Sequence, residues 1–424
     1  EFRRVLFRSI TPNYCLKIYK KYKSSAIEVI NKNPYQLAED IRGIGFKVAD
    51  SIASKIGIDK NSKDRICQGI LYTLNKSLSN GHTYLPEHVL IQDSEKLLEL
   101  NGEILKECVM MLVYNQKIHI EKVNNENLIY LMPYYLAENG VCSQIVKLSQ
   151  YEFEDLKIDI DNEINVLEED KKIKLAEKQI LAVKESVNSG VLIITGGPGT
   201  GKTTTINAII DIFENNGKSV TLAAPTGRAA KRMSETSNKE AKTIHRLLEM
   251  GFSTDDDLTF FKDEEDPINS DVIIVDEVSM VDIILMYNLL RAIKLGTRVI
   301  LVGDSDQLPS VGAGNVLKDM INSNIINVVK LNEIFRQAQE SMIIVNAHKI
   351  NNGEPLYLNT KGKDFFFIRK STNEEILNEI IGLVNERLPK FYKVDKLKDI
   401  QVLSSMRKGG SPLFILWAFT IIIL

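Results

Sequence analysis

The sequence predicts an α/β fold with a parallel sheet, preceded by a mainly helical region. After residue 175 the chain contains five short apolar runs separated by helical stretches, a pattern typical of parallel sheets: VLIIT, SVTLAA, DVIIVDE, RVILVGD and NVVKL. Between residues 11 and 90 the apolar residues recur every three or four positions, which indicates amphipathic helices. A chain of 424 residues, 44% of them hydrophobic, can bury the cores of two or three such domains.

The chain begins with residues 1–10, EFRRVLFRSI, which we interpret as a non-native linker. This segment lacks an initiator Met and an apolar stretch of signal-peptide length, and an EcoRI site encodes Glu-Phe in one frame. A helical region over 11–85 follows. Within it, LAEDIRGIGFKVADSIASKIGI predicts a helix-hairpin-helix module with Gly43 and Gly45 in the turn. Glycine lets backbone N–H groups approach a DNA phosphate there, and Lys47 adds charge; a purely structural helical hairpin is the alternative.

Two segments separate this region from the predicted sheet. Residues 86–150 predict a small mixed region of helix and strand, in which KIHIEKV and NLIYLMPYY alternate like a β-hairpin. Residues 151–172 are strongly acidic and show no clear period, so we expect a linker there.

The first motif with a chemical role follows the run VLIIT. The segment from Gly196 to Thr203 matches G-x-x-x-x-G-K-T between a strand and a helix, which is the context that a phosphate-binding loop needs. Its glycines let N–H groups surround phosphates, Lys202 supplies a charge, and the Thr203 hydroxyl is a Mg²⁺ ligand. A glycine-rich turn that matches by chance is the alternative, and the flanking elements disfavour it. The predicted nucleotide-binding residues of this loop are Gly196, Gly197, Pro198, Gly199, Thr200, Gly201, Lys202, Thr203 and Thr204.

Two further apolar runs end in polar residues. VIIVDE ends in Asp276, which would hold Mg²⁺, and Glu277, which would orient and deprotonate an attacking water. VGDSDQLPSVGAG places Asp304 and Gln307 after the next run, and an amide can donate to a phosphate oxygen and accept from water. Ligands bind at the carboxyl ends of parallel strands, so we interpret Asp276 and Glu277 as catalytic rather than as a solvated acidic edge. For the Gln307 segment by itself, a simple polar loop is the alternative.

Composition limits the partners and the compartment. The formal net charge is -3, so DNA would have to be held by local basic patches. The four cysteines show no CxxC pair and no histidine at metal-ligand spacing, which predicts reduced thiols in a cytoplasmic protein without a zinc site.

Taken in order, these motifs resemble those of the RecD-like superfamily 1 DNA helicases. The matching segments, within a resemblance that extends from about residue 11 to 408, are GGPGTGKTTT, APTGRAAKRM, TIHRLL, IVDEVSMVD, GDSDQLPSVGAGNVL and LNEIFRQAQES. The resemblance implies a RecA-like P-loop NTPase core and an ATP-dependent DNA helicase that moves 5′-to-3′ on single-stranded DNA in recombination or repair. The implied cofactors are ATP and Mg²⁺. The implied partners are single-stranded DNA and duplex DNA with a 5′ single-stranded tail; no membrane is expected, and protein partners are unknown.

The resemblance also assigns residues that the motifs alone leave open. Gln179 stands where the family recognises adenine, and Arg336 matches the arginine that reaches the γ-phosphate, a task that suits the guanidinium fork. Without the resemblance, Gln179 would be an exposed helix residue and Arg336 a surface ion-pair residue. The segments that contact DNA in the family correspond to Pro225, Thr226, Gly227, Arg228, Thr243 and His245.

The resemblance divides the rest of the chain. A first RecA-like motor domain covers 173–335, and 249–271 stands in the place of a pin hairpin that helps to part the duplex. In that hairpin Phe260 and Phe261 either face bases or pack in the core. A second RecA-like domain begins over 336–408 with a helix, DFFFI, another helix and DIQVL. The family pattern is lost from 409 onward, so we interpret 409–424 as a foreign or frameshifted tail, with a divergent buried strand and a membrane segment as the alternatives.

A membrane anchor at the uncharged end of the chain, and three other functions for the protein, are the remaining alternatives. A helix over the uncharged residues 413–424 would cover roughly 20 Å of the ~30 Å bilayer core, which disfavours an anchor. The other functions are a nucleotide-gated DNA-binding protein without turnover, a relaxase-type helicase and an RNA helicase. A relaxase needs clustered histidines ahead of the motor, and His82, His88 and His119 are not clustered in the sequence. If the second domain is truncated, this chain would bind nucleotide but hydrolyse it poorly.

Overall fold

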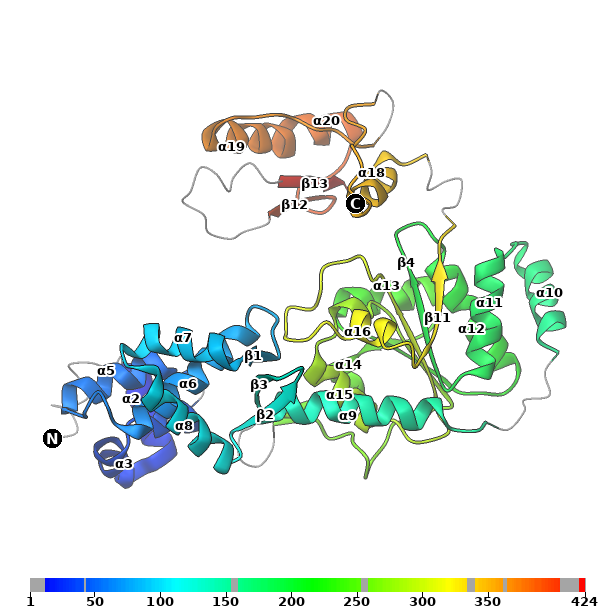
Figure 1. Cartoon of the computed structure of the whole chain (residues 1–424). Helices are drawn as coiled ribbons and strands as arrows, with labels where there is room; N and C mark the ends of the chain where they lie inside the picture. Colours follow the sequence, from blue (N-terminus) through cyan, green and yellow to red (C-terminus); the bar gives the residue numbers. More distant parts are fainter. Residues whose placement is uncertain are drawn as a thin grey trace. The chain divides into compact units, whose positions relative to one another are not determined.

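The computed structural model describes residues 12–41, 43–153, 159–252, 258–333, 340–360, 364–404 and 419–423 (Figure 1). The chain divides into two compact units, Glu1–Phe335 and Arg336–Leu424. The predicted linker over 1–10 lies outside the described residues. No helix in the described ranges is both long enough and apolar enough to cross a bilayer.

The N-terminal part of the larger unit is a group of helices followed by a small antiparallel sheet (Figure 1). The helices are α2 (Pro12–Tyr22), α3 (Ala26–Lys32), α4 (Gln36–Asp40), α5 (Phe46–Ile56), α6 (Lys63–Leu78), α7 (Glu87–Leu98) and α8 (Gly102–Tyr114). The sheet has the order β1-β3-β2 and contains β1 (Tyr84–Pro86), β2 (Ile118–Val123) and β3 (Glu126–Leu131). The expected hairpin is confirmed as β2 and β3, which Asn124 and Asn125 join at positive φ, as a two-residue hairpin turn requires.

Two helices lead from this sheet into the P-loop core, and one of them corrects an expectation. α9 (Met132–Ser149) begins with Pro133 in its first turn and packs against a helix of the core. The acidic segment expected to be a linker contains α10 (Ile160–Lys171). Ile164 and Leu167 are spaced three residues apart and are buried in the core, so this face holds the helix in place, while Asp161, Glu169 and Asp170 are exposed.

The P-loop core is a six-stranded sheet with the order β11-β4-β10-β9-β5-β6. Its strands are β4 (Val191–Gly196), β5 (Val220–Ala224), β6 (Ala241–Thr243), β9 (Val272–Val275), β10 (Arg298–Gly303) and β11 (Asn327–Leu331). All neighbouring pairs are parallel, so the five predicted apolar strands and the RecA-like P-loop class are confirmed. Alternate residues of β4 enter opposite cores: Ile193 packs on one face of the sheet and Leu192 on the other.

Helices cover both faces of this sheet, and a short hairpin interrupts the chain between β6 and β9. The helices are α11 (Glu177–Asn188), α12 (Lys202–Asn215), α13 (Gly227–Ser237), α14 (Ile244–Leu247), α15 (Ile283–Arg291) and α16 (Val316–Asn322), with a 3-10 turn at Val278–Met280. The interrupting strands are β7 (Gly251–Phe252) and β8 (Leu258–Thr259), which pair antiparallel. They lie within the segment expected to hold the pin.

In the second unit, few of the residues with described burial are buried. Its elements are α18 (Met342–Asn351), α19 (Asn373–Gly382), a π-helical turn (Leu383–Arg387), α20 (Leu388–Tyr392), β12 (Ile400–Ser404) and β13 (Phe419–Ile423). Of its residues for which burial is described, Asn346 alone is buried. The run DFFFI does not form a strand, because the Asn359 side chain hydrogen-bonds both the N–H and the carbonyl of Phe367. The expected tail lies partly outside the described residues; its described part, β13, pairs antiparallel with β12.

Candidate functional site

The parallel sheet brings the predicted motifs to a single edge. The phosphate loop follows β4, Asp276 and Glu277 follow β9, and the segment with Asp304 and Gln307 follows β10. These three strands are neighbours in the order β4-β10-β9, and their parallel registers put their carboxyl ends side by side. Polar groups separated by about a hundred residues of sequence therefore meet at one edge, where open α/β sheets bind ligands.

The phosphate loop takes the conformation that its glycines allow. Gly199 and Gly201 have φ values of +76° and +82°, which other residues rarely adopt. A Cβ on Gly196 would lie 2.8 Å from the Leu331 carbonyl oxygen, so a larger residue does not fit there. The Lys202 ammonium donates to the carbonyls of Gly196 (2.5 Å) and Gly197 (3.1 Å), so the cation lies inside its own loop. This loop can therefore present backbone N–H groups and one positive charge to a phosphate.

The residue after Asp276 has an unusual backbone. Glu277 has φ +55° and ψ +40°, a left-handed conformation that costs energy in a residue with a side chain. Its N–H donates to Asp276 Oδ1 at 2.8 Å, and the Asp276 N–H donates to the Ala223 carbonyl at 2.9 Å. The neighbouring strand thus holds the pair of carboxylates at the end of β9, where a strained turn redirects the chain.

A hydrogen bond that the sequence did not reveal connects the second and third motifs. The Ser279 hydroxyl donates to Gln307 Oε1 at 3.2 Å. Asp304 is buried and accepts from the Asp306 N–H at 3.0 Å, and this bond fixes the turn that leads to Gln307. Gln307 itself is exposed, so its amide N–H groups can reach a ligand. Ser279 stands in the quoted motif DEVSM, but the motif alone does not say which residue its hydroxyl bonds.

Burial governs the ionisation of both carboxylates. Burial raises the pKa of Asp276, while the Glu277 N–H and then the Lys202 and Arg232 cations lower it. Burial also raises the pKa of Glu277, as does the adjacent Asp276 charge. A carboxylate with a raised pKa is a stronger base, which suits proton abstraction from water. Arg232 on α13 lies close enough to influence both groups, and sequence reasoning had not singled it out.

The donor set suits magnesium. Thr203 offers an exposed hydroxyl at the start of α12, and Asp276 offers a carboxylate at the end of β9. Oxygen ligands of this kind, completed by water and phosphate, are those that Mg²⁺ prefers. The structure therefore provides suitable side chains for the predicted ion.

The structure places Gln179 beside the phosphate loop but not as an exposed helix residue. Gln179 is only 2% exposed, and its Nε2 group donates to the Gly201 carbonyl at 3.1 Å. Arg336, the predicted γ-phosphate arginine, lies outside the described residues.

The predicted DNA-contacting residues follow two further strands of the same sheet. Pro225 and Thr226 follow β5, while Thr243 ends β6. The Thr226 hydroxyl accepts from the Ala229 N–H at 3.2 Å, and Thr243 caps α14 in the same way through the Arg246 N–H. Both threonines are therefore helix caps, a role that explains their type without reference to DNA. Gly227 and Arg228 are exposed in the first turn of α13.

The hairpin divides its aromatic residues between core and solvent. Phe260 packs against the P-loop core, and its ring centroid lies 5.9 Å from that of His245. Phe261 is 51% exposed, and Phe252, which the sequence interpretation did not select, is 68% exposed. Of the two expected positions, one therefore packs in the core and the other faces solvent. β7 has only two residues, so the alternation of apolar and polar residues could not show from sequence that Phe252 faces solvent.

The predicted helix-hairpin-helix motif consists of α4, α5 and the turn between them, which contains Gly43 and Gly45. Gly43 has φ +96°, and a Cβ there would lie 3.2 Å from the Lys17 ammonium of α2. Gly45 precedes α5 with open space around it, and Lys47 is exposed in the first turn. Lys17 is thus a second cation at this turn, and it comes from a helix that precedes the motif.

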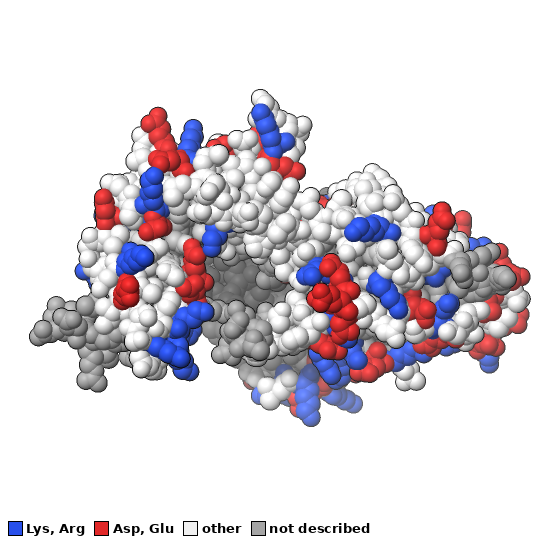
Figure 2. Space-filling model, turned by 90° about the horizontal axis from the view of Figure 1, so that it is seen from below, with Lys and Arg blue, Asp and Glu red and all other residues white. Residues whose placement is uncertain are grey.

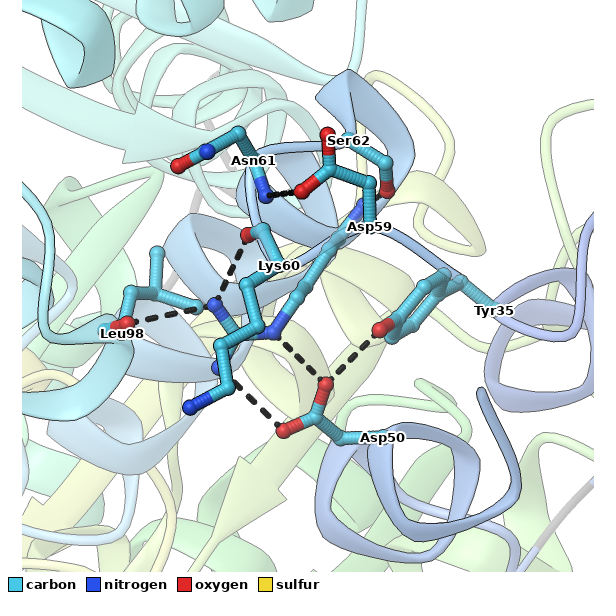
Figure 3. A network of polar contacts seen from close by, with 8 residues as sticks. Tyr35, Asp50, Asp59, Lys60, Asn61, Ser62 and Leu98 are labelled. Carbon is cyan, nitrogen blue, oxygen red and sulfur yellow. Dashed lines mark hydrogen bonds and ion pairs between the residues drawn. The ribbon is translucent and has the colours of Figure 1, made fainter. Parts of the chain in front are cut away.

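A polar network fixes α5 to its neighbours (Figure 3). Arg65 Nε on α6 donates to Asp50 Oδ1 on α5 at 2.8 Å, and the Tyr35 hydroxyl donates to the same oxygen at 2.7 Å. A further nitrogen of Arg65 donates to the carbonyls of Lys60 (3.0 Å) and Leu98 (3.1 Å). One buried guanidinium therefore joins the hairpin to the segments around α6 and α7.

Surface charge is mixed. On the face shown in Figure 2, Lys and Arg side chains are interspersed with Asp and Glu, and much of the surface carries no charge. Attraction of an anionic polymer would therefore depend on local groups of cations.

Comparison with known proteins gives matches in both parts of the larger unit. A family model described as AAA domain matches residues 179–313, and one described as ATP-dependent RecD2 DNA helicase HHH domain matches residues 8–84. A relative named ATP-dependent RecD2 DNA helicase, from Deinococcus radiodurans, is 31% identical over 81% of this chain and 48% of its own length.

Two further matches cover a smaller part of this chain. A RecBCD enzyme subunit RecD from Mycolicibacterium smegmatis is 35% identical over 46% of this chain and 38% of its own length. Among solved structures, the Pif1 helicase from Candida albicans is similar at 22% identity, with a TM-score of 0.34 over 55% of this chain and 57% of that chain. The chain spans about half the length of the RecD2 relative.

Proposed function

This chain resembles the RecD-like superfamily 1 helicases in its helix-hairpin-helix region and in its P-loop core, and from that premise we propose that it is part of a cytoplasmic ATP-dependent DNA helicase. The proposed motor couples ATP hydrolysis to 5′-to-3′ movement on single-stranded DNA in recombination or repair. The observation that carries this proposal is the meeting of the phosphate loop, Asp276, Glu277 and Gln307 at one sheet edge.

Each group at that edge has a proposed task. The loop N–H groups and Lys202 bind the β- and γ-phosphates, and binding draws the ammonium away from the carbonyls of Gly196 and Gly197. Thr203 and Asp276 would hold Mg²⁺, which neutralises phosphate charge when bound. Glu277, with its raised pKa, orients the attacking water and takes its proton.

Gln307 and Arg336 would complete the reaction. Gln307 detects the γ-phosphate, and its bond to Ser279 links that contact to the turn that carries Glu277. Arg336 would stabilise the charge that develops on the transferred phosphoryl group, as its position in the family motif implies.

The proposed path of the DNA strand runs along the ends of β5 and β6. The first turn of α13, with Gly227 and Arg228, would contact phosphates, and Pro225, Thr226, Thr243 and His245 would line the strand. In the hairpin, the exposed Phe252 and Phe261 rings are the groups available to stack on a base, whereas Phe260 supports the hairpin from the core. Gly43, Gly45 and Lys47 would give a separate, sequence-independent contact with duplex phosphates. The proposed substrate is a duplex with a 5′ single-stranded tail.

The test is ATP hydrolysis by this chain with and without single-stranded DNA, beside a Glu277→Gln variant. DNA-stimulated turnover that disappears in the variant supports the motor, and unwinding of a 5′-tailed but not a 3′-tailed duplex supports the direction. Matched RNA duplexes test the RNA alternative. If the chain binds neither ATP nor DNA, the proposal is wrong.

A second candidate is a nucleotide-gated DNA-binding protein without turnover. It is favoured by the second unit, in which no hydrophobic side chain with described burial is buried. A motor of this class needs two closed domains around the nucleotide, so ATP-dependent changes in DNA affinity without hydrolysis would support this candidate.

A further inference from the structure

A backbone hydrogen bond joins the helical region to the loop that carries Gln307. The Gly314 N–H donates to the Gly81 carbonyl at 3.1 Å. Gly81 belongs to the turn over residues 79–82 that follows α6, and Gly314 ends the 304–314 loop, which begins after β10 and contains Gln307. The two glycines lie far apart in the sequence, so this contact between the 79–82 turn and the 304–314 loop arises only in the tertiary structure.

The tip of the 304–314 loop is not held by burial. Its Leu308 and Val311 side chains are 87% and 94% exposed. Beyond the tip, the Ala313 carbonyl accepts from the Ile283 N–H at 3.1 Å. Gly314 has φ +99°, and a Cβ there would lie 3.0 Å from the Cβ of Ile283. The end of the loop is therefore fixed by close backbone contacts on two sides, one from α15 and one from the 79–82 turn.

The 79–82 turn is attached firmly to α6. Gly81 has φ +89°, its N–H donates to the Leu78 carbonyl at 2.9 Å, and the His82 N–H donates to the Ser77 carbonyl at 3.2 Å. The Arg65 network joins α6 in turn to α5, the second helix of the helix-hairpin-helix motif (Figure 3). A movement of these two helices would therefore move the Gly81 carbonyl.

The contact continues through the loop to Gln307. The Ser310 hydroxyl donates to the carbonyls of Gly312 (2.9 Å) and Gly314 (3.1 Å), which folds the segment after Gln307 onto its own end. Gln307 Oε1 also accepts from the Ser279 hydroxyl. A shift of Gly314 would therefore change where the Gln307 amide lies at the sheet edge.

We infer that the 79–82 turn positions the 304–314 loop, so that the helix-hairpin-helix region regulates how tightly the site holds a nucleoside triphosphate. This inference rests on the proposed function, in which Gln307 contacts the γ-phosphate. It extends that function by naming the contact through which DNA on the helical region acts on nucleotide affinity. The effect depends on the γ-phosphate, because a nucleoside diphosphate has no group for Gln307 to contact.

Gly81→Val in the full chain is the decisive variant. Valine is strained at φ +89°, so the turn relaxes by moving its carbonyl away from the Gly314 N–H. The matched control is Gly57→Val. Gly57 ends α5 with φ +83°, and a Cβ on Gly57 or on Gly81 would meet open space. Gly81→Asn tests for rescue, because asparagine tolerates the left-handed conformation.

Titration calorimetry measures the affinities for a non-hydrolysable ATP analogue and for ADP, each with Mg²⁺, and hydrogen exchange is read over residues 304–314. We expect Gly81→Val to bind the ATP analogue about three- to tenfold more weakly, the usual effect of one lost hydrogen bond. Exchange over 304–314 should become faster by a similar factor, while ADP affinity matches the parent. Gly57→Val and Gly81→Asn should match the parent in all three measurements.

Thermal unfolding checks that each variant is folded, and the less strained Gly81→Ala replaces the valine variant if valine prevents folding. The inference is overturned if the folded Gly81 variant binds the ATP analogue like the parent. It is also overturned if ADP binding weakens as much, since an equal loss indicates a general structural effect. The same conclusion follows if Gly57→Val or Gly81→Asn weakens the ATP analogue as Gly81→Val does. A parent chain that binds neither nucleotide would instead refute the proposed function.

Discussion

Replacing Arg65 with alanine should open the helix-hairpin-helix region and leave the P-loop core folded. The side chain of Arg65 is 11% exposed and that of its partner Asp50 is 28% exposed, so the ion pair is largely shielded from water (Figure 3). Truncation leaves the Asp50 carboxylate with the Tyr35 hydroxyl alone and removes the donor to the Lys60 and Leu98 carbonyls. Breaking a buried pair costs about 3–5 kcal/mol, and the partial exposure of Asp50 places our expectation near 3 kcal/mol.

Hydrogen exchange read peptide by peptide is the suitable assay, because it reports local opening. A loss of about 3 kcal/mol corresponds to roughly 100-fold faster exchange of the protected amides in α5 and α6. The matched control is Lys63→Ala on the same helix. Lys63 and its partner Glu107 are both more than half exposed, so we expect no measurable change. If Arg65→Ala leaves exchange in α5 and α6 within threefold of the parent, the network does not hold the hairpin and the reasoning is refuted.

Three further predictions concern the P-loop core. Lys202→Ala should weaken ATP binding about 10- to 100-fold, because charge-assisted hydrogen bonds to phosphate are lost. Titration calorimetry measures this affinity. An unchanged affinity would mean that the loop binds phosphate through its backbone alone. Phe252→Ala should weaken single-stranded DNA binding by about 1–3 kcal/mol without lowering the melting temperature, whereas Phe260→Ala should lower the melting temperature first; the reverse order would contradict the hairpin assignment. Hydrogen bonds from Ser219 lower the pKa of Asp271, so this carboxylate stabilises the fold above the ordinary Asp pKa of about 3.9 and ceases to do so as the pH falls through its lowered pKa. Asp271→Asn should therefore cost about 1 kcal/mol in urea unfolding at neutral pH, a value reduced because the side chain is 45% exposed, and the cost should shrink in acid. A cost that grows in acid would contradict this sign.

Sequence reasoning predicted the sheet and the edge at which the polar motifs meet, because both depend on local patterns. The apolar runs of β4, β9 and β10 are buried on both faces and are therefore continuous, and each is followed directly by its polar residues. Parallel strands must place those residues at the same edge. The positions of Lys202, Asp276 and Gln307 consequently followed from the chain alone.

Other features were decided by side-chain contacts that the local sequence patterns do not show. The acidic stretch expected to be a linker forms α10, because the P-loop core offers a surface for Ile164 and Leu167. The run DFFFI, which stands between two expected helices, does not form a strand; the Asn359 side chain bonds the backbone groups of Phe367 that a neighbouring strand would use. Neither competing partner is visible in the local pattern.

The sequence by itself therefore determined the class of fold, the phosphate loop and the placement of the motifs at the carboxyl ends of the strands, since periodicity and glycine spacing are local properties. Only the tertiary structure decided what individual polar side chains bond. It directed the Gln179 amide to Gly201, joined Ser279 to Gln307 and brought Lys17 to the Gly43 turn. A hydrogen bond depends on distance and direction between two groups, and those are set only when the helices and strands that carry them have packed.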